Sequence, residues 1–358
     1  MARKDKLSLA QKEQRTAYKL LIPALLILAL VAFYPLFQVF YTSFTDKVFA
    51  SGTDEAPKLI GFENYKSLLG LTVMELPKVV DETTGEASID EETGKPVYER
   101  AIRVLPRSPV RYREWFQFSL FGRRYVVGAR DPEFMKAISN TLVFAVISVF
   151  LETVLGLGVA LVVNSNFKGK GVMRATMLVP WAVITVVSAR IWEWMLQPTR
   201  AGLFNAVLSK LGWGDGDLSF LSMPALQMPT LIAVDVWKTT PFMALLILAG
   251  LQLIPRELYE AARVDGAGRL KQFLSVTLPL LKPTLAVALI FRTLDALRVF
   301  DVFQVLMGNR MYSMASYNYY QLIGNRNMGL ASAIGVIIFF LIGIFAVIYM
   351  RLMGVDKE

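Results

Sequence analysis

The chain has 358 residues, of which 54% are hydrophobic, and it carries a formal net charge of +9. Soluble domains contain about 45–50% apolar residues, so this composition, with a mean hydropathy of +0.46, indicates an integral membrane protein. Cysteine and histidine are absent, which excludes disulfides, thiol nucleophiles, the usual zinc sites and imidazole acid–base chemistry. We therefore expect neither a catalytic site nor a metal site in this chain.

Six stretches are long and apolar enough to cross a bilayer, since a helix spans the hydrocarbon layer with about 20 residues. They are residues 18–41, 138–163, 172–196, 226–251, 283–307 and 330–353. The third and fifth stretches contain charged residues, so their ends are the least sharply defined. Six crossings place both termini on the same side of the membrane.

The basic residues of the termini and short loops lie at the ends of the apolar stretches that are expected on one side of the membrane. Residues 1–17 form a basic tail, and the first apolar stretch after it is too long for a signal peptide and lacks a small-residue cleavage site. Short loops near residues 168–174 and 253–282 also have an excess of Lys and Arg. By the positive-inside rule, we expect these loops and both termini, including the tail at 354–358, to be cytoplasmic.

Residues 42–137 are then an external insertion, because long loops translocate largely regardless of their charge. Residues 81–85 and 90–96 have turn composition, and residues 111–127 alternate aromatic with basic side chains. These patterns favour a small β-rich subdomain. It is either a docking surface for a substrate-binding protein or an insertion that packs on the membrane domain.

A second external loop, around residues 197–217, is expected to contain short helices. Its stretch from Gly212 to Asp217 has paired carboxylates, as in a calcium loop. It lacks the spaced oxygen ligands and terminal Glu of an EF-hand, so a solvated turn is the better interpretation.

Residues 253–282 form a polar island between two apolar stretches. Pro255 suits the first turn of a helix, and the face that contains Ala261 and Ala262 bears nothing larger than leucine, so another surface can approach the backbone closely. Gly266 can adopt a positive φ and reverse the chain. An amphipathic segment follows, so the pattern predicts a helix, a turn and a second helix.

Several segments together resemble importer-type ABC permeases of carbohydrate uptake systems. The loop resembles their EAA loop through Glu260-Ala261-Ala262, Asp265-Gly266-Ala267 and Leu278-Pro279. Residues 61–65, 140–144, 291–296 and 300–301 match, in order and context, sugar permeases similar to the membrane subunits of maltose and trehalose transporters. The resemblance covers nearly the whole chain outside residues 72–130. The Glu-Ala-Ala triplet alone would fit an ordinary cytoplasmic helical hairpin.

The resemblance implies an all-α transmembrane fold: a first helix at 18–41, an external insertion and a permease core at 138–353, completing six helices. It implies a bacterial cytoplasmic membrane, with lipid around the helices, and a complex with a second homologous permease subunit. Two cytoplasmic ABC ATPases would use ATP and Mg, and an external sugar-binding protein would deliver substrate. Residues Glu260, Ala261, Ala262, Asp265 and Gly266 would couple the ATPases to transport.

Two classes of ligand are not expected on this chain. It has no Gly-x-x-x-x-Gly-Lys-Ser/Thr loop, so it should bind no nucleotide cofactor and ATP should be hydrolysed by a partner. No basic run is interleaved with stacking aromatics outside the apolar stretches, which argues against a nucleic-acid partner.

Charged residues inside the apolar stretches mark a possible substrate path, because they usually face a bundle interior or a wet cavity. They are Glu152, Asp235, Lys238, Arg292, Asp295, Arg298 and Asp301. For Glu152 we prefer a structural ion pair, and the same holds well for Lys238, Arg298 and Asp301. For Asp295 we favour the pathway over pairing with Arg292 or Arg298, because carboxylates, amides and aromatic rings bind uncharged sugars.

The resemblance adds specific positions to this path. The residues that match sugar-contact positions of maltose-type permeases are Thr239, Phe242, Arg292, Asp295, Ala296 and Val299, and Trp237 could supply a further ring. The expected function is ATP-driven, alternating-access uptake of a sugar, such as an α-linked disaccharide or short oligosaccharide. The alternatives are glycerol 3-phosphate or another small polar solute, with Arg292 and Lys238 as anion clamps, an ion-coupled carrier, or a membrane-embedded enzyme.

Overall fold

The computed structural model describes residues 9–50, 56–80, 88–90 and 94–353. Five helices among them are long and apolar enough to cross a membrane. They comprise Lys12–Thr42, Pro132–Asn164, Pro224–Gln252, Arg269–Leu306 and Met328–Arg351. A sixth apolar segment is made of two helices that meet at a 90° bend. The predicted helical transmembrane fold is therefore confirmed.

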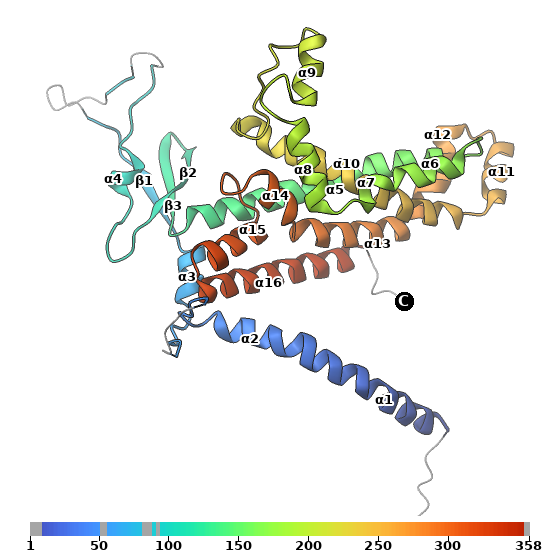
Figure 1. Cartoon of the computed structure of the whole chain (residues 1–358), viewed down its shortest axis with the longest axis horizontal. Helices are drawn as coiled ribbons and strands as arrows, with labels where there is room; N and C mark the ends of the chain where they lie inside the picture. Colours follow the sequence, from blue (N-terminus) through green and yellow to red (C-terminus); the bar gives the residue numbers. More distant parts are fainter. Residues whose placement is uncertain (1–8, 51–55, 81–87, 91–93, 354–358) are drawn as a thin grey trace, which may run out of the picture.

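The N-terminal helix stands away from the rest of the molecule (Figure 1). It is built from α1 (Leu9–Leu28), the π-helical turn η1 (Ala29–Phe33) and α2 (Tyr34–Thr42). Only its α2 end packs on the body, where the Phe40 ring lies edge-on to the rings of Phe339 and Phe340 on α16 (Met328–Met353). Most of its apolar surface is thus open to lipid or to another subunit.

The external insertion contains a three-stranded antiparallel sheet. Its strands β1 (Leu71–Leu76), β2 (Arg113–Leu120) and β3 (Arg123–Ala129) pair in the order β1-β3-β2. Phe121 and Gly122 link β2 to β3 with φ values of 49° and 76°, as a tight two-residue hairpin turn requires. The predicted β-rich subdomain is confirmed, although its docking role stays a prediction.

Short helices complete the insertion and join it to the membrane core. Helix α3 (Glu63–Leu69) precedes β1, and α4 (Ala101–Val104) packs over the sheet, where Ala101 and Leu105 bury Val126. The predicted turn at 81–85 lies outside the described residues. The one at 90–96 is closed by a hydrogen bond from the Asp90 amide to the Lys95 carbonyl.

The core is formed by α5 (Pro132–Asn164), α10 (Pro224–Gln252), α13 (Leu278–Leu297) and α16, which run side by side (Figure 1). Two glycines allow close approach. A Cβ at Gly156 would lie 3.0 Å from the Met243 Cβ, and one at Gly250 would lie 2.5 Å from the Thr284 hydroxyl oxygen. The beginning of α1 and the α11–α12 turn lie at one end of the bundle, and the sheet lies at the other.

Three predicted spans differ from the observed elements. The second begins at Pro132, because the Asp131 side chain caps α5 by accepting a hydrogen bond from the Phe134 amide at 3.1 Å. The fifth is part of a longer helix that comprises α12 (Arg269–Gln272), the π turn η2 (Phe273–Thr277) and α13. After a break at 298–300, α14 (Asp301–Leu306) continues it.

The predicted span at 172–196 is present as a broken one, and its bend was not predicted. The chain there forms α6 (Lys170–Met177), α7 (Val179–Ala182) and α8 (Thr185–Met195), with the 90° bend between α7 and α8. Val183 ends α7 in an extended conformation, with φ −71° and ψ 134°, so the i to i−4 hydrogen bonds are interrupted there. Apolar composition does not indicate where a helix breaks. The position of this break depends on contacts with other parts of the fold.

The remaining helices are short. They are α9 (Leu203–Lys210), α15 (Met314–Tyr319) and the π turn η3 (Tyr320–Gly324). The helix at 203–210 confirms that the 197–217 loop contains helical structure. Among the described residues, no group of three or more acidic side chains is arranged to hold a metal ion.

Candidate functional site

The polar island forms the predicted helix, turn and second helix. Helix α11 (Arg256–Val264) follows Pro255, which occupies the N-cap position, one residue before the first turn expected for it. The helix ends in a Schellman motif: the Ala267 amide donates to the Ala262 carbonyl at 2.8 Å, and the Gly266 amide donates to the Arg263 carbonyl at 3.0 Å. Gly266 has a φ of 76°, which confirms the predicted positive φ.

The loop is exposed but well anchored. The Tyr259 hydroxyl lies 2.9 Å from the Thr277 hydroxyl oxygen, which ties α11 to η2, and Gln272 donates to the Ala267 carbonyl at 2.7 Å. Glu260 and Ala261 are exposed, and Ala262 is half-buried. Four apolar side chains of this loop are exposed to different extents, from 42% at Leu258 to 88% at Val264; the other two are Leu253 and Leu270. Exposed apolar side chains grouped in this way are typical of protein–protein and membrane contacts.

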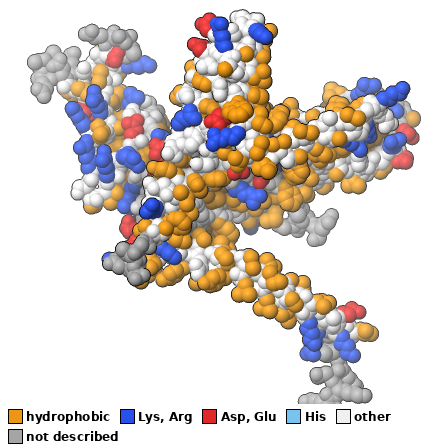
Figure 2. Space-filling view, in the orientation of Figure 1, with side chains coloured by type: hydrophobic (Ala, Val, Ile, Leu, Met, Phe, Trp, Pro, Cys, Tyr) orange, Lys and Arg blue, Asp and Glu red, His pale blue; other side chains and the backbone are white. Residues whose placement is uncertain are grey.

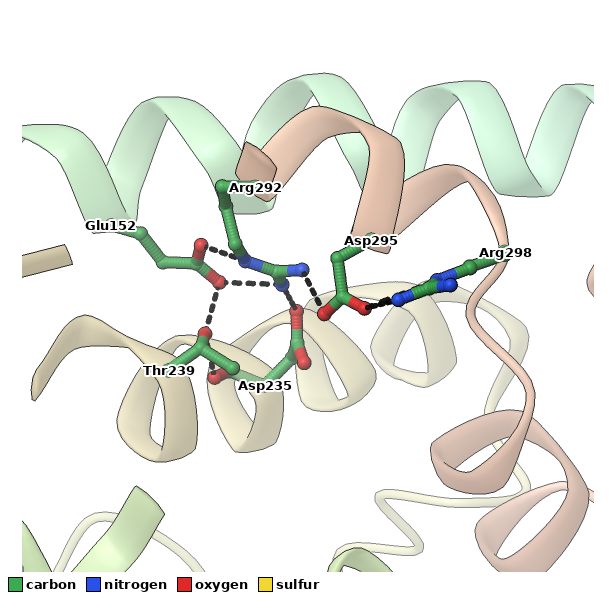
Figure 3. A network of polar contacts seen from close by, with 6 residues as sticks. All are labelled: Glu152, Asp235, Thr239, Arg292, Asp295 and Arg298. Atoms are coloured by element: carbon green, nitrogen blue, oxygen red, sulfur yellow. Dashed lines mark hydrogen bonds and ion pairs between the residues drawn. The ribbon is translucent and has the colours of Figure 1, made fainter. Parts of the chain in front are cut away.

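A second cluster lies within the helical bundle, on one face of α10. Asp235, Lys238, Thr239 and Phe242 recur at intervals of three and four residues, so they share this face. Glu152 on α5 and Arg292 on α13 approach the same face from the neighbouring helices (Figure 3). Each of these charges lies inside an apolar span, where an unpaired charge is energetically costly. Each is therefore expected to have a polar or oppositely charged partner.

Arg292 is the centre of the cluster. Its guanidinium binds both oxygens of Glu152, an oxygen of Asp235 and, at 3.3 Å, an oxygen of Asp295 (Figure 3). Thr239 donates to Glu152, and Asp295 also pairs with Arg298 at 3.1 Å. The guanidinium is only 3% exposed, so these carboxylates replace water around it. The structural pairing preferred for Glu152 is present.

The predicted pathway residues are brought together only in part. Asp295 is 55% exposed at the side chain, so it can meet a solute, whereas Arg292 is enclosed. Ala296 is fully buried between α5 and α16, which leaves no surface of its side chain for a pathway within this chain. The reason is that Ala296 lies one residue beyond Asp295 and therefore on another face of α13.

Three further candidates lie at the edges of the cluster. Val299 is half-buried, and its carbonyl accepts a hydrogen bond from Ser313 at 2.6 Å. Trp237 points away from the charges and meets Trp192 of α8 edge-on, with the ring centroids 5.5 Å apart. Phe242 is half-buried and stacks on Trp181.

Lys238 has a partner that no sequence pattern indicated. Its ammonium group donates to the Val183 carbonyl at 2.6 Å and reaches the Trp181 carbonyl at 3.5 Å, so it binds the backbone at the bend between α7 and α8. Trp181 is the aromatic residue that sequence reasoning missed. The sequence indicated only an apolar span at 172–196, and this gave no signal that Trp181 would reach α10.

The fold and the site define a multi-pass membrane subunit that carries a polar cluster inside its bundle and an exposed helix–turn–helix loop at one end. The family model for "Binding-protein-dependent transport system inner membrane component" matches residues 152–354. The chain belongs to this family, the transport subunits of ABC importers.

Two curated relatives extend the match. The trehalose/maltose transport system permease protein MalF of Thermococcus litoralis is 48% identical over 235 residues, which cover 64% of this chain and 78% of that protein. The sulfoquinovosyl glycerol transport system permease protein SmoG of Agrobacterium fabrum is 32% identical over 340 residues, 94% of this chain and 89% of that protein.

Solved structures agree on the fold. The crystal structure of a bacterial ABC transporter involved in the import of the acidic polysaccharide alginate contains a chain that superposes with a TM-score of 0.66 and 20% identity. The superposition covers 97% of this chain and 98% of that one. The shared architecture therefore includes the external subdomain as well as the membrane core.

Proposed function

We propose that this chain is the membrane-spanning permease subunit of an ABC importer that translocates a sugar, an α-linked disaccharide or short oligosaccharide, by ATP-driven alternating access. The observation that carries the proposal is the exposed, glycine-terminated helix α11 at one end of a bundle whose interior holds a charge-balanced polar cluster. The 48% identity to a trehalose/maltose permease supports the choice of sugar.

The loop is built to transmit force into the bundle. The Tyr259–Thr277 contact joins α11 to a helix that continues through η2 into α13, which carries Arg292 and Asp295. A partner that binds Glu260 and Ala261 differently in its two nucleotide states would therefore move the polar cluster. Such differential binding is what alternating access requires.

The charges of the cluster favour an uncharged solute. Three carboxylates surround the Arg292 guanidinium, and the Lys238 ammonium is used by backbone carbonyls, so neither is free to clamp a phosphate. This argues against glycerol 3-phosphate. Sugar hydroxyls can instead donate to the exposed oxygens of Asp295.

The proposed assembly has four kinds of partner. A second, homologous permease subunit completes the pathway, two ABC ATPases bind the α11 loops in the cytoplasm and use ATP and Mg, and an external binding protein delivers the sugar. Lipid covers the remaining apolar faces. The chain lies in a bacterial cytoplasmic membrane with both termini in the cytoplasm, in keeping with the basic loops at the α11 end (Figure 2).

Two substitutions in the loop test the proposal. Gly266→Val places a β-branched residue at a φ of 76°, although no atom lies within 4 Å of the added Cβ, so only the turn is disturbed. Ala261→Trp fills the exposed contact face. The matched control is Gly268→Val, because Gly268 has a φ of −68° and equally open space.

The readouts are ATPase copurified with the permease and labelled-sugar uptake in cells that express equal amounts of each variant. Gly266→Val and Ala261→Trp should both lose ATPase association, or hydrolysis stimulated by the binding protein, and uptake with it. The control should retain both activities. Wild-type uptake by both test variants would show that this loop is not the coupling element.

A further inference from the structure

We propose that the cavity beside α11 binds the phosphate group of an anionic ligand, either a phospholipid headgroup or a soluble phosphate. No residue of its lining belongs to the polar cluster around Arg292, so this site is separate from the proposed sugar pathway. The inference rests on the cytoplasmic placement of the α11 loop, which belongs to the proposed function.

The cavity lies where two membrane-spanning helices end. Helix α5 ends at Asn164 and α10 ends at Gln252, and both residues line the cavity. The start of α6 and one face of α11 close its other sides. Its volume is about 580 Å³, within the range of about 300–1,000 Å³ that is typical of small-molecule sites.

The charged side chains of the lining favour an anion. Lys170 comes from α6, Arg256 and Arg263 come from α11, and Glu260 is the single acid among the lining residues. On α11, Arg256, Tyr259, Glu260 and Arg263 recur at intervals of three and four residues, so they share the face toward the cavity. Within the part of the chain that the structure describes, the three basic side chains have neither an ion pair nor a hydrogen bond.

The beginning of α11 adds uncharged donors to the site. Ile254 and Arg256, which flank the N-cap residue Pro255, both line the cavity, and no side chain caps the helix. The free N–H groups of a first helical turn and the positive end of the helix dipole favour a nearby negative charge. The side-chain amides of Asn164 and Asn166 supply further donors.

A phosphate group fits this lining better than other anions of the membrane surface. An arginine presents a planar fork of donors that binds two phosphate oxygens at once, and a lysine adds a compact positive charge. The ends of the apolar spans lie at the depth of the lipid headgroups. Basic pockets between membrane helices on the cytoplasmic side bind anionic headgroups in other proteins.

A bound phosphate group would connect the α11 loop to the rest of the bundle. Lys170 lies on α6, whereas Arg256 and Arg263 lie on α11, so an anion held among them ties the two helices together. Tyr259 already joins α11 to η2 through the Thr277 hydroxyl. Occupancy of the cavity therefore stabilises the position of α11 against the bundle.

Two competing explanations assign no ligand to the cavity. The basic side chains form a diffuse surface that attracts anionic lipids without a defined site, or the ATPase fills the cavity in the assembled complex. A diffuse surface would be weakened equally by the loss of any exposed basic residue of the loop. Arg269 is the matched control, because it is an exposed arginine of the same loop that does not line the cavity.

The experiment titrates dioctanoyl phosphatidylglycerol into the purified complex in a neutral detergent and measures binding by calorimetry. The wild type should bind it saturably, and dioctanoyl phosphatidylcholine, whose headgroup has no net charge, should not compete. Arg256→Gln and Arg263→Gln should each weaken binding about fivefold, which corresponds to about 1 kcal/mol. Arg269→Gln should bind as the wild type does, and copurified ATPase reports that each complex has assembled.

A second titration, with inorganic phosphate, identifies the source of the phosphate group. If the ligand is a lipid, inorganic phosphate should compete with phosphatidylglycerol but bind more weakly, because it lacks the acyl chains. Tighter binding of inorganic phosphate, weakened by the same two substitutions, would assign the site to a soluble phosphate compound. Failure of both probes to bind saturably, or an equal loss in Arg269→Gln, would overturn the inference.

The same titrations on the purified chain without the ATPase separate this inference from the proposed function. If the chain alone binds phosphatidylglycerol and the complex does not, the ATPase occupies the cavity and the inference is wrong. If no ATPase copurifies with the wild-type chain, the proposed function is wrong, and binding by the chain and its arginine variants still decides whether the anion site exists.

Discussion

Asp295 and Arg292 form one ion pair, yet the structure predicts different effects when each residue is replaced. Arg292 is almost completely enclosed, whereas the Asp295 side chain is 55% exposed and its bond to Arg292 is 3.3 Å long. Asp295→Ala should therefore leave the complex assembled and impair sugar transport. Arg292→Met should prevent stable folding, because it removes the cation between two buried carboxylates.

The magnitudes follow from burial. Glu152 and Asp235 have exposed side-chain fractions of 0% and 8%. Removing their common partner costs about 3–5 kcal/mol by analogy with other buried ion pairs. Loss of the half-exposed Asp295 carboxylate costs about 0.2–1 kcal/mol, as for surface pairs, and Arg292 keeps its two buried partners.

The assay compares heat resistance of the purified complex with labelled-sugar uptake in reconstituted vesicles. The control is Asp217→Ala, which removes an exposed carboxylate from the external loop. We expect Asp295→Ala to match wild type and the control in heat resistance but to transport more slowly than either. A complex destabilised by Asp295→Ala as strongly as by Arg292→Met would show that Asp295 is a structural partner.

Three further predictions concern other parts of the molecule. The purified chain alone should bind no ATP in isothermal titration, since it has no phosphate-binding loop; micromolar binding would refute this. Gly250→Val should lower the free energy of unfolding by about 1–3 kcal/mol and reduce the yield of folded permease, because its Cβ would lie 2.5 Å from the Thr284 hydroxyl oxygen. The control Gly158→Val should do neither, because the space around that Cβ is open. Burial and the hydrogen bond to Asp131 raise the pKa of Tyr317, so folding stability should fall as pH rises above about 10. Thermal unfolding at pH 9 and 11 measures this loss, which should be smaller in Tyr317→Phe.

The helix–turn–helix loop at 253–282 was predictable because its information is local. Pro255 before the helix, Ala261 and Ala262 on it and Gly266 after it each act within one or two turns of backbone, through φ preferences and helix capping. The same is true of the spans at the N-terminus, α5, α10 and α16, where about 20 apolar residues suffice. The alternation at 111–127 also indicated strand structure, but the turn at Phe121 and Gly122 that divides this stretch into β2 and β3 was not predicted.

From the sequence, the polar cluster was predictable only as a set of intramembrane charges whose partners on other helices were unknown. Sequence identified Glu152, Asp235, Arg292 and Asp295 as intramembrane charges, and helical spacing allowed the Arg292–Asp295 pair. That Arg292 also joins Glu152, 140 residues away, is a property of how α5 and α13 pack. Spacing along one helix carries no information about its neighbours.

What the sequence determined by itself is therefore the membrane location, the number of apolar segments and the presence of an exposed helix–turn–helix loop, since each depends on composition or on contacts within a few residues. The tertiary structure alone decided that Arg292 is enclosed, that Ala296 is buried, and that the segment at 172–196 bends by 90° so that Trp181 meets Phe242. The physical reason is that the Lys238 ammonium and the Val183 carbonyl, 55 residues apart, satisfy each other only after α10 has packed against the bend.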